Sequence, residues 1–247
     1  MSRLIQNTVY DLAKTGARLD GRKLLERRPI TIETGIVQKA EGSARVKLGK
    51  TDIIVGIKLT LGEPFSDRPD EGVLMTGAEL SQIASESYEG GAPSDESIEV
   101  ARVIDRVIRE SQMIDLKALA IDEKRVWIVN VDLYTFDVDG NLFDAGVIAA
   151  VAALSTAKVP KLDGEAIMYG EYERDLPIRN TPASFTFAKI GDAILLDPTD
   201  IEEKMMSARL TVGVAGGKVC ALQKGGPAGL TDEEILKMLQ DSIKMAK

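Results

Sequence analysis

The chain of 247 residues contains no histidine and one cysteine, Cys220. Without histidine, no Ser-His-Asp or Cys-His nucleophile system can form within the chain, and the usual histidine and cysteine zinc sites are excluded as well. A single cysteine cannot form an intrachain disulfide. Because Cys220 lies in the apolar stretch VCAL, we expect a core residue rather than a reactive thiol. Any catalysis would have to rest on carboxylates, Lys, Arg, Tyr or a metal held by oxygen.

The sequence also lacks long apolar runs. The longest candidate, Ala145 to Leu154, is far shorter than the roughly 18 to 20 residues that a membrane-spanning helix needs. The first residues, MSRLIQNTVYDLAKTG, include Asp11 and have no continuous apolar segment, which argues against a secretory signal. We therefore expect a cytoplasmic protein without a membrane partner.

Positive charge is in deficit, with 31 Lys and Arg against 39 Asp and Glu and a net charge of −8. Contacts with nucleic-acid phosphates come from Lys and Arg, so an acidic chain is a poor RNA binder by bulk electrostatics. If this chain binds nucleic acid, it must use a local basic patch or one shared with a partner. Composition alone favours a small-molecule enzyme or a subunit of an assembly.

Hydrophobic patterning predicts strands and helices in two successive groups, which argues for an α+β fold. A hairpin is expected around Gly49-Lys50, and a capping box formed by Thr231 and Glu234 predicts a final helix with Ile235, Met238, Leu239 and Ile243 on one face. Other helices are expected in the first part of 6–28 and near 76–88, 97–114 and 144–157. Strands are expected near 30–33, 44–48, 52–57, 126–136, 164–168, 184–189, 192–196, 207–214 and 218–223.

Two short motifs resemble ligand-binding loops, and both fail on their spacing. Gly49-Lys50-Thr51 resembles the end of a P-loop, but the required earlier glycine is Ala44 and a strand follows in place of a helix. The stretch 137–141 resembles a calcium loop, but the required glycine and glutamate positions hold Leu142 and Ile148. The sequence therefore predicts no metal site and no cofactor.

One basic feature remains after these exclusions. Arg102, Arg106 and Arg109 have i, i+4, i+7 spacing on a predicted helix, which places them within about 60° of each other. The pattern fits a solvated face with ordinary i,i+4 pairs, Asp105 with Arg109 and Arg106 with Glu110. Spacing alone favours this solvated face, and the functional alternative is a stripe of forked donors that faces phosphates.

Six stretches occur in order along nearly the whole chain: residues 18–22 with 26–30, 42–52, 72–74, 101–106, 139–141 before an Ala-rich helix, and 196–199 with Glu202 and Glu203. Together they resemble the RNase PH family, and most closely the non-catalytic ring subunit of the archaeal exosome. The resemblance implies one domain over 1–247 with a duplicated βαβα fold, like domain 2 of ribosomal protein S5, and internal halves of roughly 25–160 and 161–247. It also implies ring assembly and phosphate-dependent 3′ trimming of RNA.

The chain departs from active members of this family at two places. Active members have an arginine pair just before the arginine-bearing helix, where this chain has Asp95 and Glu96. Their phosphate-binding Gly-Ser/Thr-Arg turn corresponds here to 141–143, which ends in Phe143. The catalytic acid of the family is retained as Asp197, followed by Glu203. Without a phosphate site to serve, we expect Asp197 to act only locally, capping the turn before Pro198.

The resemblance further implies that the active site lies at the interface of a heterodimer. The inactive subunit would contribute basic residues to the RNA path, and Arg102, Arg106 and Arg109 match those positions. The expected partners are a catalytic RNase PH-like subunit in a ring of three heterodimers, RNA-binding cap proteins and RNA. Two alternatives stay open: the chain is itself a phosphorolytic 3′-5′ exoribonuclease, or it is a purely architectural ring protein.

Overall fold

The computed structural model describes residues 3–164 and 166–246. Its helices are α1 (Arg3–Thr15), α2 (Asp95–Glu110), α3 (Leu142–Ser155), α4 (Asp200–Met205) and α5 (Asp232–Met245), with a 3-10 turn at Leu116–Leu119. Its strands are β1 (Ile30–Thr34), β2 (Gly42–Leu48), β3 (Thr51–Gly62), β4 (Val73–Glu79), β5 (Val126–Asp137), β6 (Lys158–Asp163), β7 (Ala166–Asp175), β8 (Ala183–Ile190), β9 (Ala193–Leu196), β10 (Ala208–Ala215) and β11 (Lys218–Gly225).

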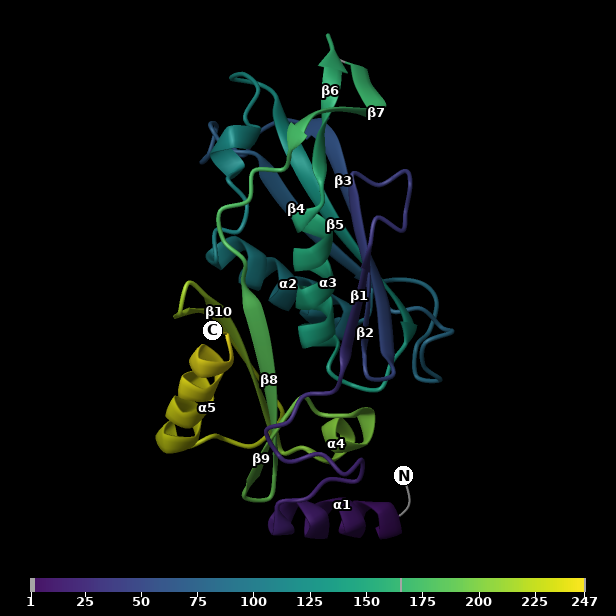
Figure 1. Ribbon diagram of the computed structural model, residues 1–247, viewed down its shortest axis with the longest axis vertical. Coiled ribbons are helices and arrows are strands. Elements are labelled where there is room, and N and C mark those ends of the chain that lie inside the picture. The colour runs from purple at the N-terminus through teal and green to yellow at the C-terminus, as the bar shows by residue number, and fades with distance from the viewer. Residues whose placement is uncertain (1–2, 165, 247) are drawn as a thin grey trace.

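The elements form layers (Figure 1). A five-stranded sheet has the order β1-β2-β3-β5-β4, and a four-stranded sheet has the order β11-β10-β8-β9. Helices α2 and α3 pack on the first sheet and also contact the second, while α5 packs on the second sheet alone. The largest apolar core lies between the first sheet and α2 and α3. The α+β fold class is therefore confirmed.

Several local predictions are confirmed. The β2-β3 hairpin turns at Gly49-Lys50, with Leu48 paired to Thr51. The capping box that begins α5 is formed, and the apolar face of that helix packs on the second sheet. The Ala-rich helix α3 is buried around most of its circumference. The core position expected for Cys220 is not confirmed, because this residue is only half-buried on β11 and lies outside the buried core clusters. Burial raises the pKa of its thiol.

The helix predicted near 76–88 is wrong. Residues 73–79 form β4, which pairs in parallel with β5, and the chain then runs without a helix until Ser94 caps α2. Sheet pairing with a distant strand overrides the local pattern here. Helix α2 ends at Glu110, short of the predicted 114, and residue 165 of the strand predicted near 164–168 lies outside the described residues. In the part of the chain that is described, no helix is long and apolar enough to cross a membrane.

Asp197 connects segments that lie far apart in the sequence. Its side chain is fully buried and accepts two hydrogen bonds from the Arg28 guanidinium, at 2.9 and 2.7 Å. Arg22 Nη1 donates to the same carboxylate at 2.9 Å, and Asn141 Nδ2 donates at 2.7 Å. These partners come from the segment before β1 and from the turn before α3. The local capping role expected for Asp197 is therefore wrong, because the carboxylate joins segments far apart in the chain.

A second ion pair and a close backbone contact reinforce this connection. Arg18 binds Glu202 of α4 through both carboxylate oxygens, and both side chains are buried. Gly140, at a φ of +79°, lies so close to Thr199 that a Cβ atom would stand 2.5 Å from the Thr199 carbonyl carbon. A side chain there would meet both backbone strain and a steric clash. The turn before α3 and the turn after β9 are thus packed backbone to backbone.

Burial alone would raise the pKa of Asp197, but the hydrogen bonds and charge of Arg28, with help from Asn141, outweigh it and lower the pKa. The carboxylate is therefore ionised in the folded protein over the whole neutral range.

Replacing this acid by its amide should destabilise the fold. Asp197→Asn removes the carboxylate that binds the buried Arg28 guanidinium through both oxygens and leaves the more distant Asp139, at 3.7 Å. Breaking such a buried pair costs about 3 to 5 kcal/mol. We expect that loss in the free energy of unfolding, measured by urea denaturation at pH 7. Asp192→Asn, at the exposed turn between β8 and β9, is the matched control and should change little.

The difference in free energy of unfolding between wild type and Asp197→Asn should also depend on pH. Because the pKa is lowered in the folded state, the stabilisation is complete above the unfolded-state value of about 3.9 and disappears as pH falls through the folded-state value. If the difference in free energy of unfolding stayed constant down to strongly acidic pH, this account of Asp197 would be wrong.

Candidate nucleic-acid interface

Helix α2 presents the arginines. It begins at Ser94, whose hydroxyl accepts the Ser97 backbone N–H at 3.2 Å, and its buried side consists of Ser97, Val100, Val103, Ile104, Val107 and Ile108. Apolar residues at this spacing stabilise an amphipathic helix by packing on a core. Arg102, Arg106 and Arg109 lie on the remaining side of the helix, where none of them is fully buried.

The three arginines differ in what they contact. Arg102 is exposed and has no hydrogen-bond or ion-pair partner among the described residues. Arg106 donates to the side-chain oxygen of Gln223 on β11 rather than to Glu110, so the expected Arg106–Glu110 pair is not formed. Arg109 forms the expected pair with Asp105, at 2.9 and 2.8 Å, and also donates to the Leu74 carbonyl of β4.

Their availability to an anion therefore falls along the helix. Arg102 has its whole guanidinium free. Arg106 uses one amino group on a neutral acceptor and keeps its charge uncompensated, with further N–H groups to donate. Arg109 is bound to a carboxylate, which offsets its charge. The structure brings the three side chains to one face, but it does not make them equivalent.

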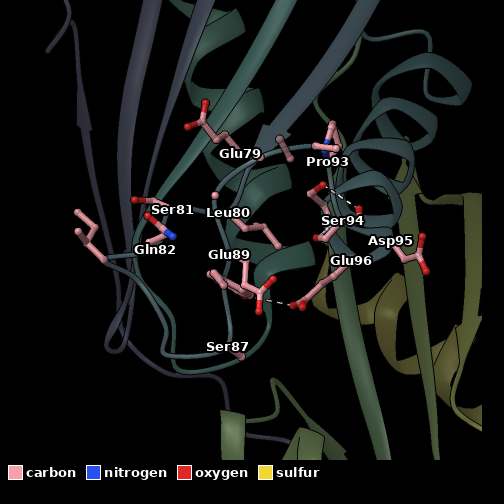
Figure 2. A pocket seen from close by; sticks show the side chains of 17 residues that line it. Glu79, Leu80, Ser81, Gln82, Ser87, Glu89, Pro93, Ser94, Asp95 and Glu96 are labelled. Carbon is pink, nitrogen blue, oxygen red and sulfur yellow. Dashed lines mark hydrogen bonds between the residues drawn. The ribbon is translucent and has the colours of Figure 1, made fainter.

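A groove of about 950 Å³ lies at the opposite, N-terminal end of α2 (Figure 2). It is bounded by the 80–94 loop and lined by four carboxylates, those of Glu79, Glu89, Asp95 and Glu96, and its lining includes no Lys or Arg. Tyr88 donates to Glu96 at 3.1 Å, and burial together with Glu96 raises the pKa of the phenol. This lining repels phosphates. A nucleic-acid backbone that contacts the arginines of α2 would therefore be repelled at the end of the helix that carries Asp95 and Glu96.

The turn that begins α3 offers no Lys or Arg side chain of its own to an anion. Asn141 adopts a left-handed conformation, and its side-chain oxygen accepts the Asp144 N–H at 3.3 Å. Phe143 is buried, and the guanidinium of Arg209 lies 4.1 Å from the centre of its ring. Arg209 in turn donates to Glu99 at 2.6 Å. An aromatic ring thus stands where an anion would need a donor, and the nearby cation is bound to a carboxylate.

The two acids after β9 are likewise committed to the fold. Asp197 is held ionised, whereas a general acid must be protonated when it acts. Glu203 accepts the Asn141 backbone N–H at 2.9 Å. Burial raises the pKa of Glu203 to about 7, with Glu96 and Asp200 acting in the same direction. Both carboxylates position the turn before α3, and no metal-binding cluster of three or more acid or cysteine side chains exists among the described residues.

Sequence reasoning missed Gln223, Glu99 and Arg209, which surround Arg106. They come from α2, β10 and β11, and no motif or local spacing marks them. Only the packing of α2 against the second sheet brings them together.

Comparisons with known proteins agree with this architecture. Residues 26–160 match domain 1 of the 3′ exoribonuclease family, RNase PH, and residues 180–244 match domain 2. The chain is 47% identical over 246 residues to the exosome complex component Rrp42 of Methanothermobacter thermautotrophicus, covering 98% of this chain and 91% of the relative. It is 46% identical to the Thermococcus gammatolerans Rrp42, covering 100% of this chain and 92% of that one.

A solved structure gives the same result. A chain of the Archaeoglobus fulgidus exosome with RNA bound to the active site matches with a TM-score of 0.92 and 40% identity, covering 98% of this chain and 95% of that chain. The resemblance found in the sequence is confirmed, together with the RNase PH-like fold. With two family models matched and relatives more than 40% identical along nearly its whole length, this protein belongs to the RNase PH family of 3′ exoribonucleases.

Proposed function

We propose that this chain is a non-catalytic subunit of an archaeal exosome ring. In this role it structures the active site of a catalytic RNase PH-like partner and contributes arginines to the path of the RNA during 3′-5′ degradation. The observation that carries the proposal is the arginine face of α2, with Arg102 free and Arg106 uncompensated, in a chain that has lost its own anion site at Phe143.

The proposed absence of catalysis rests on three features of this chain. Phe143 replaces a donor at the turn before α3. Asp95 and Glu96 place negative charge where RNA phosphates would have to lie. Asp197, the acid that matches the family's catalytic position, is held ionised by Arg22 and Arg28. None of these groups is available for phosphorolysis.

The proposal includes partners. The relatives are named exosome components, and a matching chain comes from an exosome with RNA bound at its active site. By this likeness the chain would alternate with a catalytic subunit in a ring of three heterodimers, carry RNA-binding cap proteins and work in the cytoplasm. A shared, local basic path reconciles RNA contact with a net charge of −8.

The first test concerns activity. The isolated chain should not shorten single-stranded RNA, with or without phosphate, because it lacks an anion site. The assay follows RNA length on denaturing gels, and the same preparation assembled with its catalytic partner is the positive control. Robust phosphate-dependent trimming by the pure chain would show that it is itself the enzyme.

The second test concerns the arginines. In the assembled complex, Arg102→Ala and Arg106→Ala should each weaken RNA binding and lower the salt slope of log K by roughly 0.7 to 1, since each removes one phosphate contact. Arg109→Ala should change the slope less, because Asp105 already offsets its charge. It should cost about 1 kcal/mol of stability through its lost hydrogen bonds.

RNA affinity would be titrated against salt for several RNA sequences, with ring assembly measured separately. The losses should be similar for every sequence, because backbone contacts carry no base information. Arg125→Ala removes an arginine paired with Asp122 away from α2 and serves as the control. A further variant combines Arg102→Ala, Arg106→Ala and Arg109→Ala. If it assembles and binds RNA with unchanged affinity and salt slope, the arginine face of α2 is architectural.

A further inference from the structure

Arg106 is held by a relay of side chains that spans α2, β10 and β11. Its guanidinium donates to Gln223 Oε1. Gln223 Nε2 donates to Glu99 Oε1 at 2.9 Å, and Arg209 Nη2 donates to the same Glu99 oxygen at 2.6 Å. Glu99 lies about two helical turns before Arg106 on α2, so the relay leaves the helix, passes through the second sheet and returns.

The chemistry of the relay fixes the orientation of the Gln223 amide. An amide has one face that accepts and one that donates, whereas an ionised carboxylate only accepts. Glu99 therefore selects the Nε2 side of Gln223, and Oε1 must face Arg106. Arg209 fixes Glu99, and Arg209 is itself held because it is largely buried against the ring of Phe143.

Because its acceptor is the neutral Gln223, Arg106 remains able to bind an anion. Gln223 is neutral, so it orients the guanidinium without cancelling its charge, and it occupies only one of the amino groups. Arg109, by contrast, is oriented by a carboxylate that offsets its charge, and Arg102 has no partner to orient it among the described residues. Of the three arginines, Arg106 is the one that is held in place by a side chain and has no carboxylate partner among the described residues.

We propose that Gln223 is a positioning residue for RNA binding, which presents Arg106 to the RNA backbone as a preorganised and uncompensated cation. This inference rests on the proposed function, because it assigns a support to one of the RNA contacts. Preorganisation strengthens binding by removing the ordering cost from the binding step.

The test uses the complex assembled with its catalytic partner and a single-stranded RNA. Gln223→Met keeps the length of the side chain and removes both of its hydrogen bonds. RNA affinity should fall roughly threefold to tenfold, the range expected for one lost hydrogen bond. The same substitution at Gln240, exposed on α5, is the matched control and should leave affinity unchanged.

A double-mutant cycle separates positioning from general support of the fold. In an Arg106→Ala background, Gln223→Met should have no further effect on RNA affinity. An equal loss in both backgrounds, or no loss from Gln223→Met while Arg106→Ala weakens binding, overturns the positioning role. If Arg106→Ala itself leaves RNA binding unchanged, the proposed RNA contact fails instead, so the two failures are distinguishable.

A second variant covers the case in which Gln223→Met fails to assemble. Gln223→Glu keeps an acceptor for Arg106 but turns a neutral contact into an ion pair that offsets the charge. It also removes the donor to Glu99 and places a second carboxylate beside Glu99, so it adds negative charge next to Arg106. RNA affinity should fall, and the salt slope should drop by roughly one unit, as if the phosphate contact had been removed. Wild-type affinity and slope in Gln223→Glu would overturn the proposal.

Discussion

The carboxylate of Asp197 is the contact on which the arrangement of the two sheets depends. It is buried between the segment that precedes β1 and the turn that begins α3, and it binds Arg22, Arg28 and Asn141 at once. Because α3 packs on both sheets, fixing its start fixes their relative placement. In this arrangement α2 also contacts β11, and Gln223 of β11 reaches Arg106.

The same contact limits the chemistry of the chain. An acid that protonates a leaving group must hold a proton near neutral pH, and Asp197 is held ionised by two guanidinium groups. Burial raises the pKa of Glu203 to about 7, and Glu203 Oε1 accepts the Asn141 backbone N–H. At this position the fold uses Asp197 as a structural counter-charge and Glu203 as an acceptor for the turn before α3. This supports the proposal that catalysis belongs to a partner chain.

Local patterns in the sequence predicted the elements whose causes are local. The β2-β3 hairpin, the capping box of α5 and the arginine face of α2 all follow from residues close in the chain. The failures have distant causes. Strand β4 forms by pairing with β5, Asp197 binds Arg28 across 169 residues, and Arg106 binds Gln223 across 117 residues. No spacing rule reports such pairs, so the stripe could be predicted but the differences among its arginines could not.

In an acidic chain, an arginine can bind a phosphate with its full charge only if it does not form an ion pair with one of the chain's own carboxylates. Glu99 lies about two helical turns before Arg106 on the same helix. Arg209 occupies Glu99, and Gln223 links Glu99 to Arg106. Arg209 is held against the ring of Phe143, which lies at the turn where the resemblance to active family members implies a phosphate-binding arginine. Under the proposed function, Phe143 would leave that turn without a cationic side chain and would also help Arg209 to occupy Glu99. The proposed loss of catalysis and the proposed RNA contact would then share one structural cause.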